Sequence, residues 1–535
     1  MKKLVVCVAL LAISIFAFGC GKCQHEYVEK TVLATCEVDG YNRMVCNKCG
    51  DIQNQEVLNK KEHVYSEFIK TPTCVEDGTE ISVCQNCDDV KINKTLEAIG
   101  HDYVLTELIT EKTEIDNCGK YVCTVCQEEK TDVVTAESVG MPILSFNGDI
   151  SEMTKEKKVT VSVSYDDGED TVECDATLKW QGASSIAYPK KNYTMQLLKK
   201  GTTDKNKVVL NEDWGKQSKY CLKANYVDFS HARNVVSGRI YNEIVKSRDL
   251  EDEVSKLNNG GVVDGFPILI YINGEYQGLY TLNIPKDKWM AGMDDDEEGD
   301  DVVTKQALLM GETWNDYVGL QKTVDGNFSS CGFELEYCST EDTIGDEWVY
   351  DSFNDMIEFI NNNDGEDFKN GISNYVNVDR TIDSMLYTWI IMAADNVSKN
   401  ILWFTYDGVH WNSSMYDMDG VWGMTWSGLE YYNASTVSKE NYIDWSNVLW
   451  NKIYKNFKSD VIERYFELRT SVLSKERVKE HFVLFNESIS PLAFVAEKQK
   501  WTGIPSKETS NVNQIIEFME ERFTALDSYL LTQLN

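Results

Sequence analysis

The chain has 535 residues, which is too long for one typical core and predicts two or more domains. A hydrophobic content of 42% and 13 tryptophans supply enough apolar material for a large folded unit. The formal net charge of −35 argues against nucleic acid or an anionic lipid surface as the main partner, and it fits a soluble protein in an extracellular or cation-rich setting.

The N-terminal segment has the features of an export signal. Two lysines precede an apolar run from Leu4 to Gly19, which is short for a membrane span. Gly19-Cys20 resembles the cleavage site of bacterial lipoproteins, so we predict a lipoprotein-type signal peptide over residues 1–20 and lipidation of Cys20. An uncleaved anchor helix is the alternative. We expect an exported chain, either extracellular or held at the outer face of the cell membrane by the lipid anchor only.

Three Cys/His repeats occupy residues 24–136. Histidines recur every 38 residues, at His25, His63 and His101. A lone cysteine followed by a Cys-x-x-Cys pair recurs with the same spacing in the first two copies, and the third copy is shortened. These cysteines are Cys36, Cys46 and Cys49, then Cys74, Cys84 and Cys87, then Cys118, Cys123 and Cys126.

This ligand pattern predicts small zinc-ribbon-like units. A Cys-x-x-Cys turn lets two thiolates reach one tetrahedral ion, and a third cysteine with a histidine such as His63 or His101 completes a structural zinc site. Three cysteines per copy cannot pair completely as disulfides, which favours zinc. Disulfides between units are the alternative in an exported chain. The spacing leaves open which histidine serves which cysteine trio. Units of this size need a bound metal ion or disulfides to be stable, and we expect the repeats to form a spacer without catalytic function.

From Met141 onward the composition changes to that of a larger domain. The segments "KKVTVSVSYDD", "ATLKWQGASS" and "KKNYTMQLLKK" predict strands, and "FSHARNVVSGRIYNEIV" has helical spacing. "FPILIYINGEYQGLYTLNI" predicts a hairpin that turns at Asn273-Gly274. After about residue 350 the pattern is mostly helical. A β-rich front half and a helical back half predict an α+β, two-lobed domain over residues 141–535.

A helix and a hairpin are predicted in the middle of this helical half. "TIDSMLYTWIIMAAD" places its apolar residues on one face, which predicts a helix over residues 381–394. "NILWFTY" and "VHWNSSMY" flank Asp407-Gly408, which is a strong signal for a two-residue turn. This turn pairs Tyr406 with Val409 and fixes the register of both strands.

The predicted register brings polar side chains together. Asp417 lies opposite Ser398 in this register, beside the loop that holds Asp395 and Asn400. Two carboxylates and an amide from distant parts of the sequence then meet at one point. Such a group predicts metal binding and proton transfer, and an ordinary acidic loop is the alternative. The spacing D-x-x-x-x-N, then a hairpin, then Asp is also that of a protein kinase.

Four segments are similar to motifs of a known family, the CotH kinases of spore coats, which have an atypical kinase-like fold. The segments are "GASSIAYPKKNYTMQL", "LKANYVDFSHARN", "YINGEYQGLYTL" and "DNVSKN…YDMDGVWG". They stand in the family's order over about residues 141–430, and the Cys/His repeats fall outside the resemblance. The resemblance implies a kinase that uses ATP with magnesium or manganese.

The resemblance also implies which residues contact the nucleotide. Lys191 would hold the ATP phosphates, and the strand pattern of "KKNYTMQL" places it on the buried face while Lys190 points to solvent. Asp395 would accept the proton of the substrate hydroxyl. The remaining cofactor-binding residues by this resemblance are Ser184, Ser185, Arg233 and Asn234, and the metal ligands are Asn400, Asp417 and Asp419.

One residue departs from the family pattern. The hairpin motif usually continues to a glutamate, and Ile284 occupies that position here. The expected function is a secreted or surface-anchored kinase that phosphorylates serine or threonine hydroxyls of a protein on the cell or spore surface. Because of Ile284, a catalytically inactive kinase-like module with a binding or structural role is the alternative.

Overall fold

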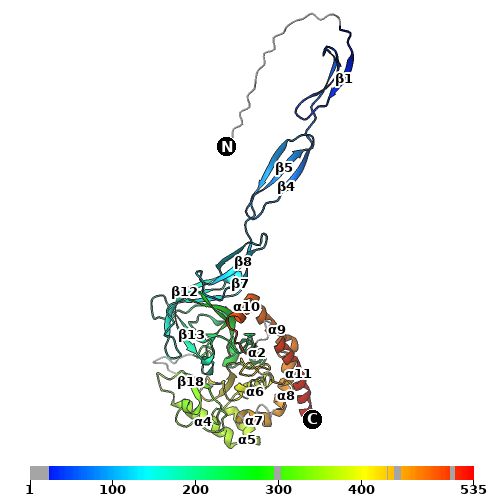
Figure 1. Ribbon diagram of the computed structural model, residues 1–535. Coiled ribbons are helices and arrows are strands. Elements are labelled where there is room, and N and C mark those ends of the chain that lie inside the picture. Colours follow the sequence, from blue (N-terminus) through cyan, green and yellow to red (C-terminus); the bar gives the residue numbers. More distant parts are fainter. Residues whose placement is uncertain (1–22, 294–302, 430–431, 439–446, 507–511, 535) are drawn as a thin grey trace. The chain divides into compact units, whose positions relative to one another are not determined.

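The computed structural model describes five stretches of the chain, shown in Figure 1: residues 23–293, 303–429, 432–438, 447–506 and 512–534. The predicted signal peptide and Cys20 lie outside the described residues. Contacts divide the chain into a smaller unit, Met1–Tyr103 with Cys123–Glu128, and a larger unit, Val104–Val122 with Glu129–Asn535. Among the described residues, no helix is both long and apolar enough to cross a membrane.

Each predicted Cys/His repeat forms a three-stranded antiparallel sheet with its strands in chain order. The first two sheets belong to the smaller unit, whereas most of the third belongs to the larger unit. Most side chains of the outer strands are exposed, so the sheets have little apolar core. The strands are β1 (Tyr27–Val32), β2 (Gly40–Cys46) and β3 (Ile52–Leu58), then β4 (Tyr65–Lys70), β5 (Gly78–Cys84) and β6 (Val90–Leu96), then β7 (Tyr103–Leu108), β8 (Cys118–Cys123) and β9 (Glu129–Val133).

The front half of the larger unit is a closed barrel with the strand order β10-β11-β12-β13-β14-β16-β15. Parallel pairing of β10 with β15 closes it. The predicted turn at Asn273-Gly274 is confirmed, since both residues have the positive φ, 51° and 75°, that a type I′ turn requires. The strands are β10 (Ile143–Asn147), β11 (Val159–Asp166), β12 (Thr171–Gln181), β13 (Asn192–Leu198), β14 (Lys219–Lys223), β15 (Gly265–Ile272) and β16 (Glu275–Asn283).

The back half combines a four-stranded sheet, ordered β18-β17-β19-β20, with helices (Figure 1). The predicted α+β class is confirmed, and the two-lobed kinase-like arrangement stays a prediction. The strands are β17 (Ala307–Gly311), β18 (Phe333–Cys338), β19 (Ile401–Thr405) and β20 (Trp411–Met415). The helices of the larger unit are α1 (Ala136–Val139), α2 (Arg233–Ser247), α3 (Glu253–Lys256), α4 (Glu347–Asn362), α5 (Gly365–Gly371), α6 (Val378–Ile391), α7 (Val448–Asn456), α8 (Lys458–Arg469), α9 (Lys475–Glu487), α10 (Pro491–Lys500) and α11 (Asn513–Gln533).

Helix α6 is the central helix of the back half. The side chain of Asn377 caps its first turn by accepting a hydrogen bond from the Arg380 amide. Residues 380–391 are all buried, so the helix packs on every side and not on the single face expected from the sequence. It ends at Ile391, three residues before the predicted end, and the next residue, Met392, has a left-handed φ of 59°.

The hairpin of β19 and β20 differs from its predicted register by one residue. Ile401 pairs with Met415 and Thr405 with Trp411, so the connection spans residues 406–410 and is not a two-residue turn at Asp407-Gly408. The reason is the Asp407 carboxylate, which accepts hydrogen bonds from the backbone amides of residues 409 and 410. These side-chain bonds replace the backbone bonds of a tight turn.

Candidate functional site

Three carboxylates line one small pocket of the larger unit. Asp395 lies in a short 3-10 helix, η5 (Ala394–Val397), directly after α6. Asp417 and Asp419 lie in the loop after β20. The predicted proximity of Asp395 and Asp417 is therefore observed, although the hairpin register differs from the predicted one by one residue. The remaining lining residues are Ala394, Asn396, Gly420, Trp426 and Tyr432.

The two loops that carry these carboxylates are joined by Asn396. Its buried side-chain amide donates to the carbonyl oxygens of Asn400, at 3.1 Å, and Tyr416, at 2.8 Å. Asn400 and Asp417 both have left-handed backbones, with φ of 54° and 60°. Such conformations cost energy and persist where the surroundings fix them, often at functional sites. Asn400 is buried at this junction and does not line the pocket.

A lysine that the sequence reasoning did not select contacts the pocket. Lys223, at the end of β14, lies 3.0 Å from a carboxylate oxygen of Asp417. Its side chain is 10% exposed, whereas 37% of the Asp417 side chain remains exposed. Burial opposes the charge on Lys223, but the Asp417 carboxylate outweighs it and raises the pKa of the ammonium above its ordinary value. Burial raises the pKa of the Asp417 carboxyl, but the charge of Lys223 outweighs burial and the pKa is lowered.

The second aspartate of the loop has the opposite electrostatic environment. Burial, and after it the negative charge of Asp417, raises the pKa of Asp419 well above its ordinary value. Asp228 and Asp395 add to this repulsion. A divalent ion bound at this pocket would relieve the repulsion between these carboxylates.

The start of α2 holds the Asp417–Asp419 loop in place. Asn234 accepts a hydrogen bond from the Met418 amide at 3.0 Å, and the Arg233 Nε donates to the Val421 carbonyl at 3.0 Å. Arg233 is itself fixed by the buried carboxylate of Asp228, at 2.5 Å. Arg233 and Asn234, two of the residues predicted to bind the cofactor, therefore contact the backbone of the aspartate loop.

The lysine predicted to hold the phosphates is placed differently from the prediction. Lys190, expected in solvent, is 1% exposed and lies 2.6 Å from the Glu497 carboxylate. Lys191 is only half-buried and donates to the carbonyl oxygens of Ile186 and Tyr188, both at 2.6 Å. The cause is the strand boundary, since β13 begins at residue 192 and the alternation of strand faces does not extend to the two lysines.

Ser184 and Ser185 also lie outside the carboxylate pocket. They form a short 3-10 helix, η1 (Ser184–Ala187), between β12 and β13. The Ser185 hydroxyl accepts a hydrogen bond from the Asn192 side chain at 3.4 Å. Neither serine is among the described residues that line the pocket.

Comparison with known proteins decides the family. The model of the CotH kinase protein family matches residues 178–526, which is more than half of the chain. The chain belongs to the CotH kinase family. A search of curated proteins finds no match. The CotH match includes all three pocket carboxylates, Lys223 and the start of α2, and it excludes the Cys/His repeats.

The position that departs from the CotH hairpin motif lies in the core. Ile284 is 0% exposed, and two residues later Lys286 forms ion pairs with Glu334, at 2.9 Å, and Glu336. Burial raises the pKa of Glu336 to about 7 against the opposing charge of Lys286. The carboxylates beside this lysine therefore come from β18 and from Glu312, directly after β17, and not from the end of the hairpin.

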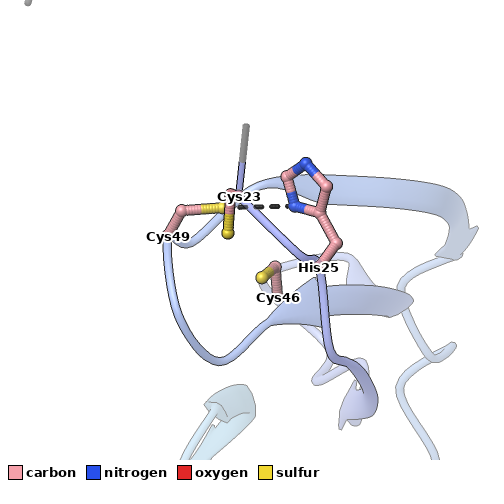
Figure 2. A group of neighbouring side chains, drawn as sticks. All are labelled: Cys23, His25, Cys46 and Cys49. Carbon is pink, nitrogen blue, oxygen red and sulfur yellow. Dashed lines mark hydrogen bonds between the residues drawn. The ribbon is translucent and has the colours of Figure 1, made fainter. Parts of the chain in front are cut away.

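Outside the CotH match, the cysteines and histidines of the repeats form three groups of four. In each group the ligand atoms lie within 4.8 Å of one another. Figure 2 shows the first group, in which Cys23 and His25 face the Cys-x-x-Cys turn. The groups are Cys23, His25, Cys46 and Cys49, then Cys36, His63, Cys84 and Cys87, then Cys74, His101, Cys123 and Cys126.

These groups correct the predicted ligand sets. Cys23, which the repeat spacing did not single out, joins the first group. Cys118 belongs to none of the groups in the described residues, and its sulfur contacts the Thr113 hydroxyl at 3.0 Å. It begins β8, which corresponds to the first residue of β2 and β5 and not to the positions of Cys36 and Cys74.

Proposed function

We propose that this CotH-family chain is a kinase that transfers a phosphoryl group from ATP to serine or threonine hydroxyls of a protein. The observation that carries the proposal is the convergence of Asp395, Asp417 and Asp419 on one pocket, with the charged Lys223 paired to Asp417. Phosphoryl transfer depends on positioning and on electrostatic stabilisation, and these groups supply both.

Asp417 and Asp419 fit a magnesium or manganese ion. Both offer the hard carboxylate oxygens that such ions prefer, and the partly exposed side chain of Asp417 leaves an oxygen accessible. A bound ion would neutralise the charge of the phosphate groups. Asn400 is the third proposed ligand, and it is buried at the junction of the two loops, where its backbone amide donates to the Gly311 carbonyl at 2.7 Å.

Asp395 is the proposed proton acceptor for the substrate hydroxyl. It lines the pocket on the opposite loop from Asp417, and its side chain is 30% exposed. Lys399, one helical turn later in the chain, lies 3.5 Å from its carboxylate. Trp426, which is 66% exposed at the pocket rim, provides an apolar surface against which a substrate segment could pack.

A catalytically inactive binding module is the second candidate, and Ile284 favours it because a family glutamate is replaced by a core side chain. For either function we propose that the chain acts outside the cytoplasm, on a partner at the cell or spore surface. The N-terminal lysines and apolar run, followed by Cys20, support export and a lipid anchor.

Nucleotide titration tests which lysine serves the phosphates. Lys223→Ala is expected to weaken Mg-ATP binding by about ten- to a hundredfold, the scale of one lost charged hydrogen bond. Lys191→Ala is expected to leave the affinity nearly unchanged, since its ammonium is satisfied by two carbonyl groups of its own loop. Isothermal titration of both variants and the wild type, with Mg²⁺ and with EDTA, gives the comparison. Weaker ATP binding in Lys191→Ala alone would instead indicate that Lys191 binds the phosphates, as the family motif implies.

A further inference from the structure

The two ends of each repeat are too far apart to share one metal ion. In the first repeat, Tyr27 pairs with Cys46 at one end of the β1–β2 ladder and Val32 pairs with Tyr41 at the other. Six paired residues separate these ends by about 17 Å. Cys36 lies in the turn beyond Val32, whereas Cys46 and Cys49 lie at the opposite end. A site built from Cys36, Cys46 and Cys49 of one repeat is therefore excluded by the length of the sheet.

The lone cysteine instead contacts the next repeat. The sulfur of Cys36 lies 3.9 Å from that of Cys84, and the sulfur of Cys74 lies 3.8 Å from that of Cys123. A zinc ion with Zn–S distances of about 2.3 Å sets its sulfur atoms about 3.8 Å apart in a tetrahedron. A disulfide would require about 2.0 Å. Each cysteine that the structure describes has a free thiol.

The histidine distances agree with the same geometry. In the three groups, the histidine Nδ1 lies 3.3, 3.4 and 3.3 Å from the second sulfur of the Cys-x-x-Cys turn. A tetrahedral zinc site with Zn–N of about 2.0 Å predicts about 3.5 Å for this edge. A tyrosine two residues after each histidine stacks on its ring, at 5.3, 5.5 and 5.1 Å. This stacking orients the imidazole toward the sulfurs, as outer partners do in metal sites.

In the first group, Cys23 takes the place that the lone cysteine of the preceding repeat has in the other two groups. It stands two residues before His25, so one short segment gives two ligands and the Cys-x-x-Cys turn gives the other two (Figure 2). Cys23 therefore supplies the fourth ligand of the first group.

The third repeat has no cysteine at the turn position that Cys36 and Cys74 occupy in the first two repeats. The position 38 residues after Cys74 is Lys112, whose ammonium donates to the carbonyl of Asn273 at the turn of the β15–β16 hairpin. Beside it, the Asn117 amide donates to the Gly274 carbonyl at 3.0 Å. A Cβ at Gly274 would lie 2.0 Å from the Asp116 carboxylate, so this contact requires glycine. Hydrogen bonds to the barrel replace the metal link at this end.

We infer that the repeats hold three zinc ions and that the second and third ions each join two successive repeats, while Cys23 closes the first site. Each link takes one thiolate from the turn of one repeat and two thiolates with an imidazole from the next. The inference does not depend on kinase activity.

Zinc counts on the purified full chain and its cysteine variants test the ligand sets. Elemental analysis of the wild type should give three zinc ions per chain. Cys36→Ser and Cys84→Ser should each lose one ion, and the double variant should still lose only one, because both cysteines serve the same ion. Cys36→Ser combined with Cys46→Ser should lose two. Cys118→Ser, a cysteine outside the groups, is the matched control and should keep three.

Two results would overturn the inference. One is the reverse pattern, in which the double variant of Cys36 and Cys46 loses one zinc ion and the double variant of Cys36 and Cys84 loses two. The other is a wild type without metal whose cysteines resist a thiol reagent after denaturation, which would indicate disulfides. A substitution in the second or third group could release several ions by unfolding the repeats. In that case the first group gives the same test, by comparison of Cys23→Ser with the double variant Cys23→Ser/Cys46→Ser. Both should lose one ion, and a loss of two from the pair would contradict the shared site.

Discussion

Asp417→Asn is expected to remove most of the effect of Mg²⁺ on nucleotide binding. The change deletes one negative charge and one anionic ligand while it keeps the shape of the side chain. Asparagine also tolerates the left-handed backbone at this position, φ 60°, so the loop should keep its conformation. Loss of an outer partner of a metal site typically costs 10- to about 100-fold in affinity, and loss of the ligand itself should cost about 100-fold or more.

The measurement is a titration of ATP at saturating Mg²⁺ and in EDTA, on the variant and on the wild type. Affinity in EDTA should be similar for both, and only the wild type should gain from the metal. Asp460→Asn, an exposed acid on α8, changes the net charge equally and should behave as wild type. A variant that still gains the full effect of Mg²⁺ would show that Asp417 is not a ligand.

Asp395→Asn is expected to separate binding from turnover. A positioned proton acceptor contributes about 10²- to 10⁴-fold to a rate, so kcat should fall by that factor. Mg-ATP affinity should stay near that of the wild type, because Asp395 lies on the other loop from the proposed metal ligands. Turnover with a serine-containing protein substrate and ATP titration of the same samples give both quantities.

The fold provides the control for this variant. The thermal unfolding midpoint should not change, since the Asp395 side chain is 30% exposed and is not part of the core. Equal loss of ATP affinity and of kcat would instead indicate a general disturbance of the pocket.

The features that the sequence predicted correctly depend on local rules. The Asn273-Gly274 turn follows from two residues that tolerate positive φ. The helical spacing of "FSHARNVVSGRIYNEIV" predicts α2, whose buried face includes Val236 and Ile240. The D-x-x-x-x-N spacing and the hairpin led to aspartates that line one pocket, because a hairpin returns the chain to its start in either register.

The errors at the pocket arose where a side chain or a boundary changed the local rule. Asp407 accepts backbone hydrogen bonds, which lengthened the predicted turn and shifted the register. The start of β13 after Lys191 made the strand alternation misleading for both lysines. Lys223 was missed, although a lysine within the mostly apolar strand "KYCLK" is a signal that its charge meets a partner.

The repeats show a different limit of sequence reasoning. The 38-residue period revealed the ligands but not their grouping, because cysteines near in sequence, such as Cys36 and Cys46, lie at opposite ends of a sheet. Only the length of the β1–β2 ladder excludes their sharing an ion. Cys23 was not predicted because it lies outside the 38-residue pattern. In the first group it takes the place that the lone cysteine of the preceding repeat has in the other two groups.

Phosphate transfer by the purified full chain is the most direct test of the proposed kinase. The chain is incubated with γ-labelled ATP and a serine- and threonine-containing protein, with Mg²⁺, with Mn²⁺ or with EDTA, beside Asp395→Asn. The account predicts metal-dependent, acid-stable label on serine or threonine, strongly reduced in the variant. A wild type that binds no ATP and transfers no label under either metal would contradict it, and the pocket would then be an acidic, cation-binding part of a non-catalytic module.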